Sequence, residues 1–550
     1  MSVTILGVFS ARRRDGHRLH DGNAAAMRLE GEVASPITAI GEERLTGQKH
    51  GDGFTRSARY CLESVGYQQS DRLIVGFSSS LDSPWPEVDV RTEVRTALGL
   101  HADEVLVNQH HDSHAVGAYV GSGFNRALVI VVDGEGNRLP DGIETTPVYL
   151  AQQDVRSGFS LRLLSREGTD GRGLGQLYRG ATKYLGFASY HEANKVMALS
   201  GVGRSRGLDP IEPHTAGDLL MSGLDTSNIL DSFTLSLGKV RPHLPPVRPG
   251  WFSDRRYGEE LDLSNEYLQV AVTVQEIVEV RLRQLVMEWS ARTGVTSVCL
   301  GGGVAMNCVA AAKLRGSGLR VFVPGAPSDE GQALGNLLTV LAHVSPDHLP
   351  TSISGYLGAN GAVLSTSSAE SLESDSLVND LRAGLVVARH FGGSEYGPRA
   401  LGHRSLLAVP KLNPQLLDSL RRIKRRERFQ PFGVIVSDEQ ASKLDVDPSP
   451  YMSFAPVLTG RASDWFSDVS HVDGTCRIQT LTAEQDPSLY ATLRTLEECG
   501  AAPVVNTSLN PRGKPLLETA AQTASLVRDS PDIAVAYVEG QRLLSTSLHP

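Results

Sequence analysis

The sequence predicts an α/β protein with two large domains. A chain of 550 residues is longer than one hydrophobic core usually holds, so two domains are expected. Short apolar runs typical of buried strands alternate with longer segments of helical periodicity, which is the pattern of an α/β fold. A serine-rich stretch within 351–377 indicates a surface connection. We therefore expect domains at 1–355 and 378–550, joined by residues 356–377.

The individual elements follow from these apolar runs. A buried strand is expected at 3–9, and a turn at 20–27 leads into the next strand. The second block is expected to start on a strand at 385–388 and to include another at 503–505. In between, we expect helices at 54–65 and 268–288 and strands at 73–77, 105–107, 127–132 and 298–300. Ligands of α/β folds bind at the carboxyl ends of the strands, so polar residues there are candidate site residues.

Composition excludes several function classes. The net charge is −9 and no long basic tract is present, so we expect no nucleic-acid partner. The five cysteines are an odd number without a CxxC pair, which favours a reduced, cytoplasmic compartment. The first residues lack the pattern of a signal peptide. No apolar run approaches the about 18 residues of a membrane span, so no membrane is expected. The oligomeric state is not readable from the sequence.

A first group of residues has the composition of a metal site. His110 and His114 are four apart, which places them on one face of a helix, and Asp133 and Asp329 lie near the ends of apolar strands. Two imidazoles and two carboxylates suit Fe²⁺, Mn²⁺ or Zn²⁺ and do not distinguish them. The alternative is that the histidines only pack or cap a helix. His111 is offset from the pair, so we expect it behind the ligands.

Glycine-rich turns accompany these residues. They lie at 134–136, 301–303 and 331, where the missing side chain lets backbone N–H groups approach a phosphate. Each turn alone is weak evidence, since three consecutive glycines usually form only a turn. Their shared position near apolar strands favours a phosphate-bearing ligand.

A second group of residues is rich in arginine. Arg399 lies between Gly397 and Gly402, and guanidinium groups bind phosphates and carboxylates through paired hydrogen bonds. A triphosphate with a small anionic co-substrate would require such residues. Arg421, Arg422 and Arg425 fit an ordinary solvated helix face instead. An RNA surface is disfavoured because no stacking aromatics are interleaved.

Together these segments resemble a known family, the O-carbamoyltransferases, over nearly the whole chain. That family includes nodulation carbamoyltransferases and the enzymes that carbamoylate tobramycin, cephamycin and ansamycin antibiotics. The motifs that carry the resemblance are His20-Asp21-Gly22, Glu42 to Thr46 with Lys49, HHDSHA at 110–115, GGVAMNC at 302–308, GPRALGHRS at 397–405, HVDGT at 471–475 and NTSLN at 506–510.

The resemblance implies an architecture and an activity. The N-terminal domain would be a duplicated α/β fold similar to the TsaD-like ATPases of the actin/sugar-kinase superfold, and the C-terminal domain would be YrdC-like. The YrdC-like domain would convert ATP, with Mg²⁺, and carbamoyl phosphate into carbamoyl adenylate. The TsaD-like domain would deliver the carbamoyl group to a hydroxylated small-molecule acceptor, with a secondary metabolite such as an antibiotic as the expected class.

The resemblance also implies roles for individual residues. Fe²⁺ would be held by His110, His114, Asp133 and Asp329. Carbamoyl adenylate would be bound by Lys49, Asp133, Gly301, Gly302, Gly303 and Asn307. ATP and carbamoyl phosphate would be bound by Arg399, Arg404, Lys424, Arg477, Asn506 and Ser508. His20 would lie near the acceptor as the general base, with Asp21 as an alternative base or as the group that orients the histidine.

The chain departs from the family pattern at two places. Members often have EGExKxMGLA where this chain has EANKVMAL at 192–199, and Arg-Pro-Phe where it has Gln430-Pro431-Phe432. The second change puts one anion contact in doubt. Polar loops at 12–18 and 243–251 are candidate acceptor contacts, although an ordinary surface loop is the simpler interpretation.

Two other functions compete with this interpretation. One is a tRNA-modifying enzyme that handles threonylcarbamoyl groups, which the net charge of −9 disfavours. The other is a nucleotide-sensing protein on a degenerate scaffold, which the intact candidate ligands disfavour.

Overall fold

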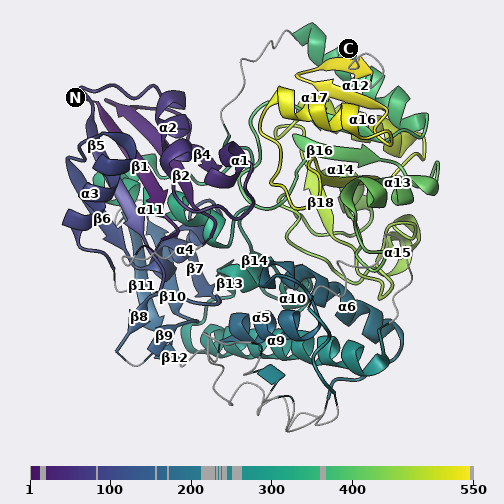
Figure 1. Ribbon diagram of the computed structural model, residues 1–550, viewed down its shortest axis with the longest axis horizontal. Helices are drawn as coiled ribbons and strands as arrows, with labels where there is room; N and C mark the ends of the chain where they lie inside the picture. The colour runs from purple at the N-terminus through teal and green to yellow at the C-terminus, as the bar shows by residue number, and fades with distance from the viewer. Residues whose placement is uncertain are drawn as a thin grey trace. The chain divides into compact units, whose positions relative to one another are not determined.

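The computed structural model divides into two compact units (Figure 1). The first unit comprises Met1–Thr46, His50–Arg255 and Asp262–Ile353, and the second comprises Gly47–Lys49, Arg256–Leu261 and Ser354–Pro550. The residues that the structure describes are 2–12, 16, 20–81, 84–140, 142–154, 158–166, 168–169, 173–211, 230, 233–234, 237, 244–249, 263–358 and 367–544.

The first sheet of the first unit has the order β3-β2-β1-β5-β6, with β4 also paired to β2. β1 is parallel to β5 and antiparallel to β2, and β5 is parallel to β6. Apolar side chains of α2 and α3 pack against this sheet in one core. Bounds are β1 Val3–Phe9, β2 Asn23–Glu30, β3 Val33–Ala34, β4 Thr38–Gly41, β5 Arg72–Ser78, β6 Glu104–Asn108, α1 Glu42–Thr46, α2 Thr55–Ser64 and α3 Glu87–Leu98.

The second sheet repeats this pattern with the order β11-β10-β7-β13-β14. Here β7 is antiparallel to β10 and parallel to β13, which is parallel to β14. Each sheet thus starts with three antiparallel strands in chain order and adds two parallel strands beyond the first, so the first unit is a duplicated α/β fold. Bounds are β7 Arg126–Val131, β10 Val148–Asp154, β11 Gly158–Ser165, β13 Ser297–Gly301 and β14 Arg320–Phe322.

Helices of the first unit connect and cover these sheets. α11 lies against β1, where Asn336 Nδ2 donates to the carbonyl of Val8 at 2.8 Å. A small third sheet has the order β12-β9-β8. Bounds are α4 His110–Tyr119, β8 Arg138–Leu139, β9 Gly142–Glu144, β12 Gly168–Thr169, α5 Leu174–Tyr184, α6 Ala193–Ser205, α9 Asn265–Thr293, α10 Cys308–Arg315 and α11 Gln332–Val344.

The second unit is built on one seven-stranded mixed sheet with the order β18-β17-β19-β16-β15-β20-β21. Two apolar clusters of the unit contain side chains from the strands and from the flanking helices. Bounds are β15 Val387–His390, β16 Arg404–Ala408, β17 Gly433–Ser437, β18 Ile478–Leu481, β19 Val504–Ser508, β20 Val535–Val538, β21 Gln541–Leu544, α12 Ser367–Arg382, α13 Gln415–Lys424, α14 Asp438–Lys443, α15 Gly460–Trp465, α16 Pro487–Glu498 and α17 Ala520–Asp529.

The connection expected at 356–377 is shorter than the composition indicates, because α12 starts at Ser367. Serine weakens a helix only slightly, and Leu377, Val378 and Leu381 present an apolar stripe to the core of the second unit. The high serine content of this stretch therefore led us to predict a loop where the apolar spacing at its end indicates a helix.

The other expected strands and helices lie within a few residues of the observed ones, but the turn expected at 20–27 is wrong from Asn23 onward, because β2 starts there. The helix expected at 268–288 is the larger part of α9, and the strands expected at 73–77 and 127–132 are β5 and β7. No helix of the described residues is long and apolar enough to cross a membrane.

Candidate functional site

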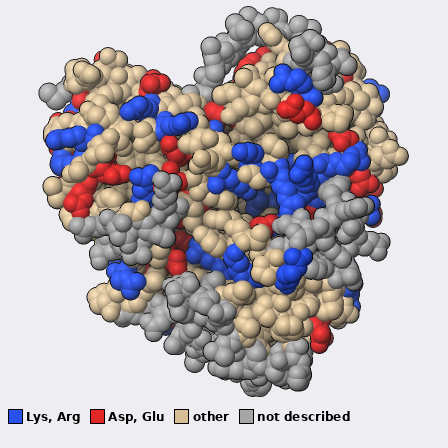
Figure 2. All heavy atoms as spheres, in the orientation of Figure 1, with Lys and Arg blue, Asp and Glu red and all other residues tan. Residues whose placement is uncertain are grey.

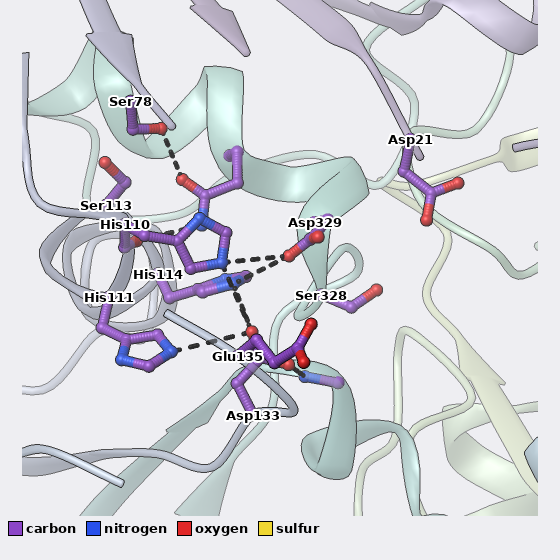
Figure 3. A network of polar contacts seen from close by, with 12 residues as sticks. Asp21, Ser78, His110, His111, Ser113, His114, Asp133, Glu135, Ser328 and Asp329 are labelled. Atoms are coloured by element: carbon purple, nitrogen blue, oxygen red, sulfur yellow. Dashed lines mark hydrogen bonds and ion pairs between the residues drawn. The ribbon is translucent and has the colours of Figure 1, made fainter. Parts of the chain in front are cut away.

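The first unit brings His110, His114, Asp133 and Asp329 together (Figure 3). One potential ligand atom of each residue lies within 4.8 Å of those of the other three. Nε2 of His110 is 3.3 Å from Asp133 Oδ2 and 3.2 Å from Asp329 Oδ1. Nε2 of His114 is 3.4 Å and 3.3 Å from the same oxygens. Two imidazole nitrogens and two carboxylate oxygens thus converge on one point.

The secondary structure explains this convergence. The two histidines start α4 one turn apart, and His110 N–H donates to Asn137 Oδ1 at 2.6 Å. Asp133 follows β7, and its Oδ1 accepts from the backbone N–H of Gly303 at 2.9 Å. Asp329 starts a short 3₁₀ turn directly before α11. The second sheet therefore positions the Asp133 carboxylate, and the start of α11 positions that of Asp329.

The electrostatics of this group fit a cation. Burial favours the neutral imidazole, but the carboxylates of Asp329 and Asp133 outweigh burial and raise the pKa of His110 to about 9. Burial would raise the pKa of Asp133, but the three neighbouring imidazoles hold it well below its usual value. Nε2 of His114 and Oδ1 of Asp329 are buried without a hydrogen-bond partner among the described residues. Both atoms thus have free lone pairs aimed at the point of convergence, as metal ligands require.

A further set of residues supports the ligands from behind, and the sequence revealed only His111 among them. His111 has the offset position expected for it. Its Nδ1 is 2.9 Å from Glu144 Oε2 and its Nε2 is 3.7 Å from Asp133 Oδ2. Glu144 is fully buried and pairs with Arg166 Nε at 2.5 Å. A buried carboxylate fixes the orientation of His111 and hence of the Asp133 carboxylate. Neither Glu144 nor Arg166 lies in a motif, so only the fold identifies them.

The glycine turns have a different role from the expected one. The N–H of Gly302 donates to the carbonyl of Pro327 at 2.7 Å, and the N–H of Gly303 donates to Asp133. A Cβ on Gly302 would lie 2.5 Å from the carbonyl oxygen of Val132, and its φ is +85°. The N–H groups of Gly302 and Gly303 are therefore engaged within the first unit, and contact of 301–303 with an adenylate stays a prediction. Glycine indicates close approach, and here the approaching group is the strand that carries Asp133.

Asn307 is also a structural residue. Its Oδ1 accepts from the N–H of Ala310 at 3.1 Å, which caps α10, and its Nδ2 donates to Gln275 Oε1 at 2.9 Å. Gln275 Nε2 donates back to Asn307 Oδ1 at 3.1 Å. Both ends of the amide are thus engaged within the first unit, and the adenylate contact of Asn307 stays a prediction. An asparagine at a helix N-terminus is a preferred cap, and that signal was present in the sequence.

The predicted general base lies in a second group of the first unit. His20 Nδ1 is 2.7 Å from Asp21 Oδ2, and the other oxygen, Oδ1, is 2.8 Å from His50 Nδ1. His20 Nδ1 is also 4.0 Å from Asp329 Oδ2. The ring of His191 stacks on that of His50, with centroids 3.8 Å apart. His50 and His191 were not singled out in the sequence, because neither shares a motif with His20 and Asp21. They lie 29 and 170 residues from Asp21 along the chain.

The second unit carries an arginine-rich group, and Figure 2 shows lysine and arginine side chains gathered over the region of β18 and α13. The Arg426 guanidinium lies 4.8 Å from the centre of the Phe432 ring. Burial, together with the charges of Arg399 and Arg421, outweighs Glu427 and lowers the pKa of Arg426 to about 10. Like charges held this close favour binding of an anion. Arg426 is a candidate that the sequence interpretation missed, because it stands in a run that fits a solvated helix.

Arg404 makes hydrogen bonds within the second unit. Its guanidinium is buried, and Nη1 donates to the carbonyl of Phe391 at 2.8 Å while Nη2 donates to that of Gly392 at 3.0 Å. These hydrogen bonds hold the chain between β15 and Arg399. Contact of Arg404 with ATP or carbamoyl phosphate stays a prediction. When two arginines lie five residues apart in a glycine-rich turn, the sequence does not show which of the two guanidinium groups is exposed.

Three further predicted contacts are engaged within the second unit. Lys424 Nζ donates to the carbonyl and Oγ of Ser508 at 2.7 and 2.9 Å and also to Asn510. Burial and the charges of Arg426 and Lys49 hold the pKa of Lys424 well below its usual value. Asn506 Nδ2 donates to the carbonyl of Ala400 at 3.1 Å and to Gln479. Its Oδ1 is a buried acceptor without a partner among the described residues, and contact of Asn506 with ATP or carbamoyl phosphate stays a prediction.

The remaining predicted residues are placed as follows. Arg399 is half-buried, and Arg477 directly precedes β18 beside Gly433. Lys49 belongs to the second unit, whereas the 301–307 segment belongs to the first. Gln430, which replaces the family arginine, donates to Glu427 at 2.5 Å. Most of the loops at 12–18 and 243–251 lies outside the described residues.

The comparisons with known proteins match both the N-terminal and the C-terminal part of the chain. Residues 90–214 and 250–338 match the family model "Carbamoyltransferase N-terminus", and residues 378–542 match "Carbamoyltransferase C-terminus". Nodulation protein NolO of Bradyrhizobium diazoefficiens is 30% identical, over 74% of this chain and 74% of that protein. Nodulation protein NolNO of Sinorhizobium fredii is 29% identical, over 92% of this chain and 76% of that protein.

A solved structure of full-length HypF in its phosphate- and nucleotide-bound form is 14% identical, with a TM-score of 0.32, over 62% of this chain and 47% of that chain. Likeness at this level supports no statement about function. The family models and the NolO relative together place the chain in the carbamoyltransferase family. The protein is accordingly a transferase of carbamoyl groups.

Proposed function

We propose that the protein is an ATP-dependent O-carbamoyltransferase that activates carbamoyl phosphate as carbamoyl adenylate and carbamoylates a hydroxyl of a small molecule. The observation that carries this proposal is the convergence of His110, His114, Asp133 and Asp329 in a chain of the carbamoyltransferase family. An acceptor from secondary metabolism, such as an antibiotic, is the expected class. No nucleic acid takes part.

We assign activation to the second unit, which we take to be YrdC-like. Water cleaves carbamoyl phosphate to carbamate and orthophosphate, and a carbamate oxygen then attacks the α-phosphorus of ATP, from which pyrophosphate leaves. Both substrates carry several negative charges, so their binding needs uncompensated cations. Arg399 and Arg426 supply them, since the pKa of Arg426 is lowered by burial and by like charge. ATP enters as its Mg²⁺ complex.

We assign transfer to the first unit, which we take to be TsaD-like. The nitrogen lone pair deactivates a carbamoyl carbonyl, so an alcohol attacks it only when the leaving group is good, as AMP is. His20 accepts the hydroxyl proton and Asp21 orients it, given the 2.7 Å between Nδ1 and Oδ2; the opposite assignment, with Asp21 as the base, uses the same contact. General-base help of this kind contributes roughly 10²–10⁴-fold.

The four converging residues fit a divalent cation. The unpartnered His114 Nε2 and Asp329 Oδ1 are donors that such an ion would satisfy. We expect Fe²⁺, and Mn²⁺ or Zn²⁺ suit the same mixed nitrogen and oxygen donors. Bound there, the ion would supply Lewis-acid charge to the departing phosphate. His111, Glu144 and Gly303 would hold the donor side chains in place.

The first experiment needs no acceptor. The purified protein is mixed with Fe²⁺, Mg²⁺, ATP and carbamoyl phosphate, pyrophosphate release is followed, and carbamoyl adenylate is sought by mass spectrometry. We expect pyrophosphate that depends on carbamoyl phosphate and is lost in Arg399→Ala. Arg425→Ala, whose side chain is exposed, is the matched control and should retain the activity.

Two results would refute the proposal. One is orthophosphate released from the γ-position of ATP without carbamoyl phosphate, which indicates a kinase-like or ATPase activity. The other is the absence of turnover in protein that is folded by circular dichroism, which indicates a nucleotide-binding protein without this chemistry.

A further inference from the structure

Arg179 of α5 lies beside the candidate cation ligands of the first unit, although the sequence interpretation gave it no role. Its guanidinium group lies over Gly134, the residue that follows Asp133. A Cβ on Gly134 would lie 2.6 Å from Cζ of Arg179 and 2.8 and 2.9 Å from its Nη2 and Nη1. Because these three distances are nearly equal, the flat face of the guanidinium covers Gly134. The N–H donors lie along the edge of that plane and therefore do not point at this backbone.

The packing of α5 fixes this position. Gly175 lies one turn before Arg179 on the helix, and a Cβ there would lie 2.7 Å from the carbonyl oxygen of Asp133. Gln176 Nε2 donates to the carbonyl of Gly134 at 3.2 Å. Residues four apart share one face of a helix, so α5 presents Arg179 to the turn that carries Asp133. One partner of Gly134 in that turn is thus a guanidinium group.

Most of the hydrogen-bonding capacity of Arg179 is unused within the described residues. Nη1 donates to Glu135 Oε2 at 3.3 Å, which is longer than the usual hydrogen bond between a guanidinium and a carboxylate. Nε and Nη2 have no hydrogen-bond partner in the part of the chain that the structure describes. The side chain is 23% exposed. A ligand can therefore reach the remaining N–H donors.

Tyr190 lies between Arg179 and the candidate base. Cζ of Arg179 is 4.9 Å from the centre of the Tyr190 ring, and the centre of that ring is 6.0 Å from the centre of the His20 ring. One aromatic ring thus separates the guanidinium from His20 on one side, while Gly134 separates it from the Asp133 backbone on the other. The guanidinium is placed between the cation ligands and the candidate base.

The charge of Arg179 acts on both of these groups. Burial would lower the pKa of Arg179, but the carboxylates of Glu135 and Asp133 outweigh burial and raise it, so the guanidinium is charged. Burial and the charge of Arg179 lower the pKa of His20, although the hydrogen bond with Asp21 raises it overall. A fixed positive charge with unused donors is suited to an oxyanion.

We propose that Arg179 is a further catalytic residue, which donates hydrogen bonds to the phosphate of carbamoyl adenylate during carbamoyl transfer. This rests on the proposed function and adds to it a residue outside the family motifs. In the transfer step, the acceptor oxygen bonds to the carbamoyl carbon, the bond from that carbon to the phosphate oxygen breaks, and the hydroxyl proton passes to His20 or Asp21. AMP leaves with one more negative charge than its phosphate carried in the adenylate, and Arg179 stabilises that charge. Glu135 competes with the phosphate for the guanidinium.

The test measures phosphate binding and not activity. The full chain is stripped with a chelator, loaded with one equivalent of Co²⁺, and titrated with inorganic phosphate while the visible Co²⁺ absorption is recorded. The absorption is assigned to the first site by its loss in His110→Gln and its retention in His343→Gln, an exposed histidine of α11. We expect phosphate to change the wild-type spectrum in a saturable way.

Two variants should shift this titration in opposite directions. Arg179→Gln should raise the half-saturating phosphate concentration by roughly 10–100-fold, because it removes charged hydrogen bonds to phosphate. Glu135→Gln should lower that concentration, because it removes the competing carboxylate. Arg283→Gln, on an exposed position of α9, is the matched control and should bind phosphate as the wild type does. An ion pair that only stabilises the fold would give the first two variants shifts of the same sign.

The proposal is overturned if phosphate leaves the wild-type spectrum unchanged, or if Arg179→Gln binds Co²⁺ and phosphate as the wild type does. If Arg179→Gln does not fold, Arg179→Lys replaces it. That variant keeps the charge without the paired donors, so it should bind phosphate more weakly than the wild type, and equal binding would overturn the proposal. Carbamoyl-phosphate-dependent pyrophosphate release is measured in parallel. Its absence would refute the proposed function, while the phosphate titration would still decide whether Arg179 binds a phosphate.

Discussion

The candidate sites of the two units differ in the sign of the charge that needs compensation. In the first unit, two imidazoles face two carboxylates. The carboxylates outweigh burial and raise the pKa of His110 to about 9. The metal-free group therefore balances its negative charge with a proton on His110. In the second, Arg426 lies near Arg399 and Arg421 with Glu427 as the main compensating charge. Guanidinium groups do not lose protons at neutral pH, so an anion must relieve that repulsion. The comparison supports the proposal of a cation at the first site and of an anion at the second.

The strongest way to break this comparison is to remove one cation ligand. His110→Gln should lower carbamoyl transfer by roughly 10³-fold, because Lewis-acid stabilisation is worth several kcal/mol. Pyrophosphate release should stay near the wild-type rate, because the variant leaves the second unit intact. Both rates are measured in one assay with an identified acceptor, and His343→Gln serves as the control. Equal loss of both rates would contradict the separation of the two chemistries.

A second variant tests the group beside the cation site. His20→Asn should slow transfer by about 10²-fold or more with pyrophosphate release unchanged, because His20 lies 2.7 Å from Asp21 in the first unit, whereas Arg399 and Arg426 belong to the second. The measurement is the single-turnover transfer rate from preformed adenylate. A full transfer rate would exclude His20 as the general base.

A third pair of variants sharpens the anion side. Arg426→Ala should weaken ATP-dependent pyrophosphate formation by about 10–100-fold, since a charged hydrogen bond to phosphate is worth about 1.5–3 kcal/mol. Its neighbour Arg425, whose side chain is exposed, provides the matched substitution and should change the rate less than about twofold. Steady-state pyrophosphate release against ATP concentration separates the two. Equal effects would show that position 426 has no special role.

The residues of the cation site were easier to predict from the sequence than those of the anion site, because local geometry constrains only the former. Histidines four apart in a helix must share a face, so His110 and His114 followed from spacing once α4 was expected. The arginines lie on separate loops, and spacing does not say whether a guanidinium faces a cavity or, as for Arg404, the carbonyls of Phe391 and Gly392. Motif residues include those that build the fold and those that bind ligands.

The residues that support the ligands from behind, Glu144 and Arg166, were not predictable for a related reason. Glu144 and Arg166 act on Asp133 through His111, and no sequence pattern joins β9, β11 and α4. Close approach was expected at the glycines 302 and 303, and the structure shows that the chain around Val132 and Asp133 is one partner there. Long-range contacts of this kind depend on how the strands of the second sheet pair.

The pH dependence of cation binding gives the smallest effect and the most direct test of the proton held by the first site. Burial alone would lower the pKa of His110, but Asp329 and Asp133 raise it to about 9, so at pH 7 the metal-free imidazole is protonated and cannot ligate. A cation must displace that proton, and its affinity should rise up to about tenfold per pH unit from about pH 7 and level off near pH 9. Asp133 adds no proton in this range, because its pKa lies well below the usual value.

This is measured by calorimetry with Mn²⁺ in buffers of different ionisation enthalpy. At least about one proton should be released per cation at pH 7, because Asp133 and Asp329 outweigh burial and raise the pKa of His114 as well, and fewer protons should be released as the pH approaches 9. An affinity that does not change over this range would mean that His110 is already neutral. The charge balance that distinguishes the first unit from the second would then rest on Asp133 and Asp329 being neutralised in another way, and the contrast between the two sites would no longer hold.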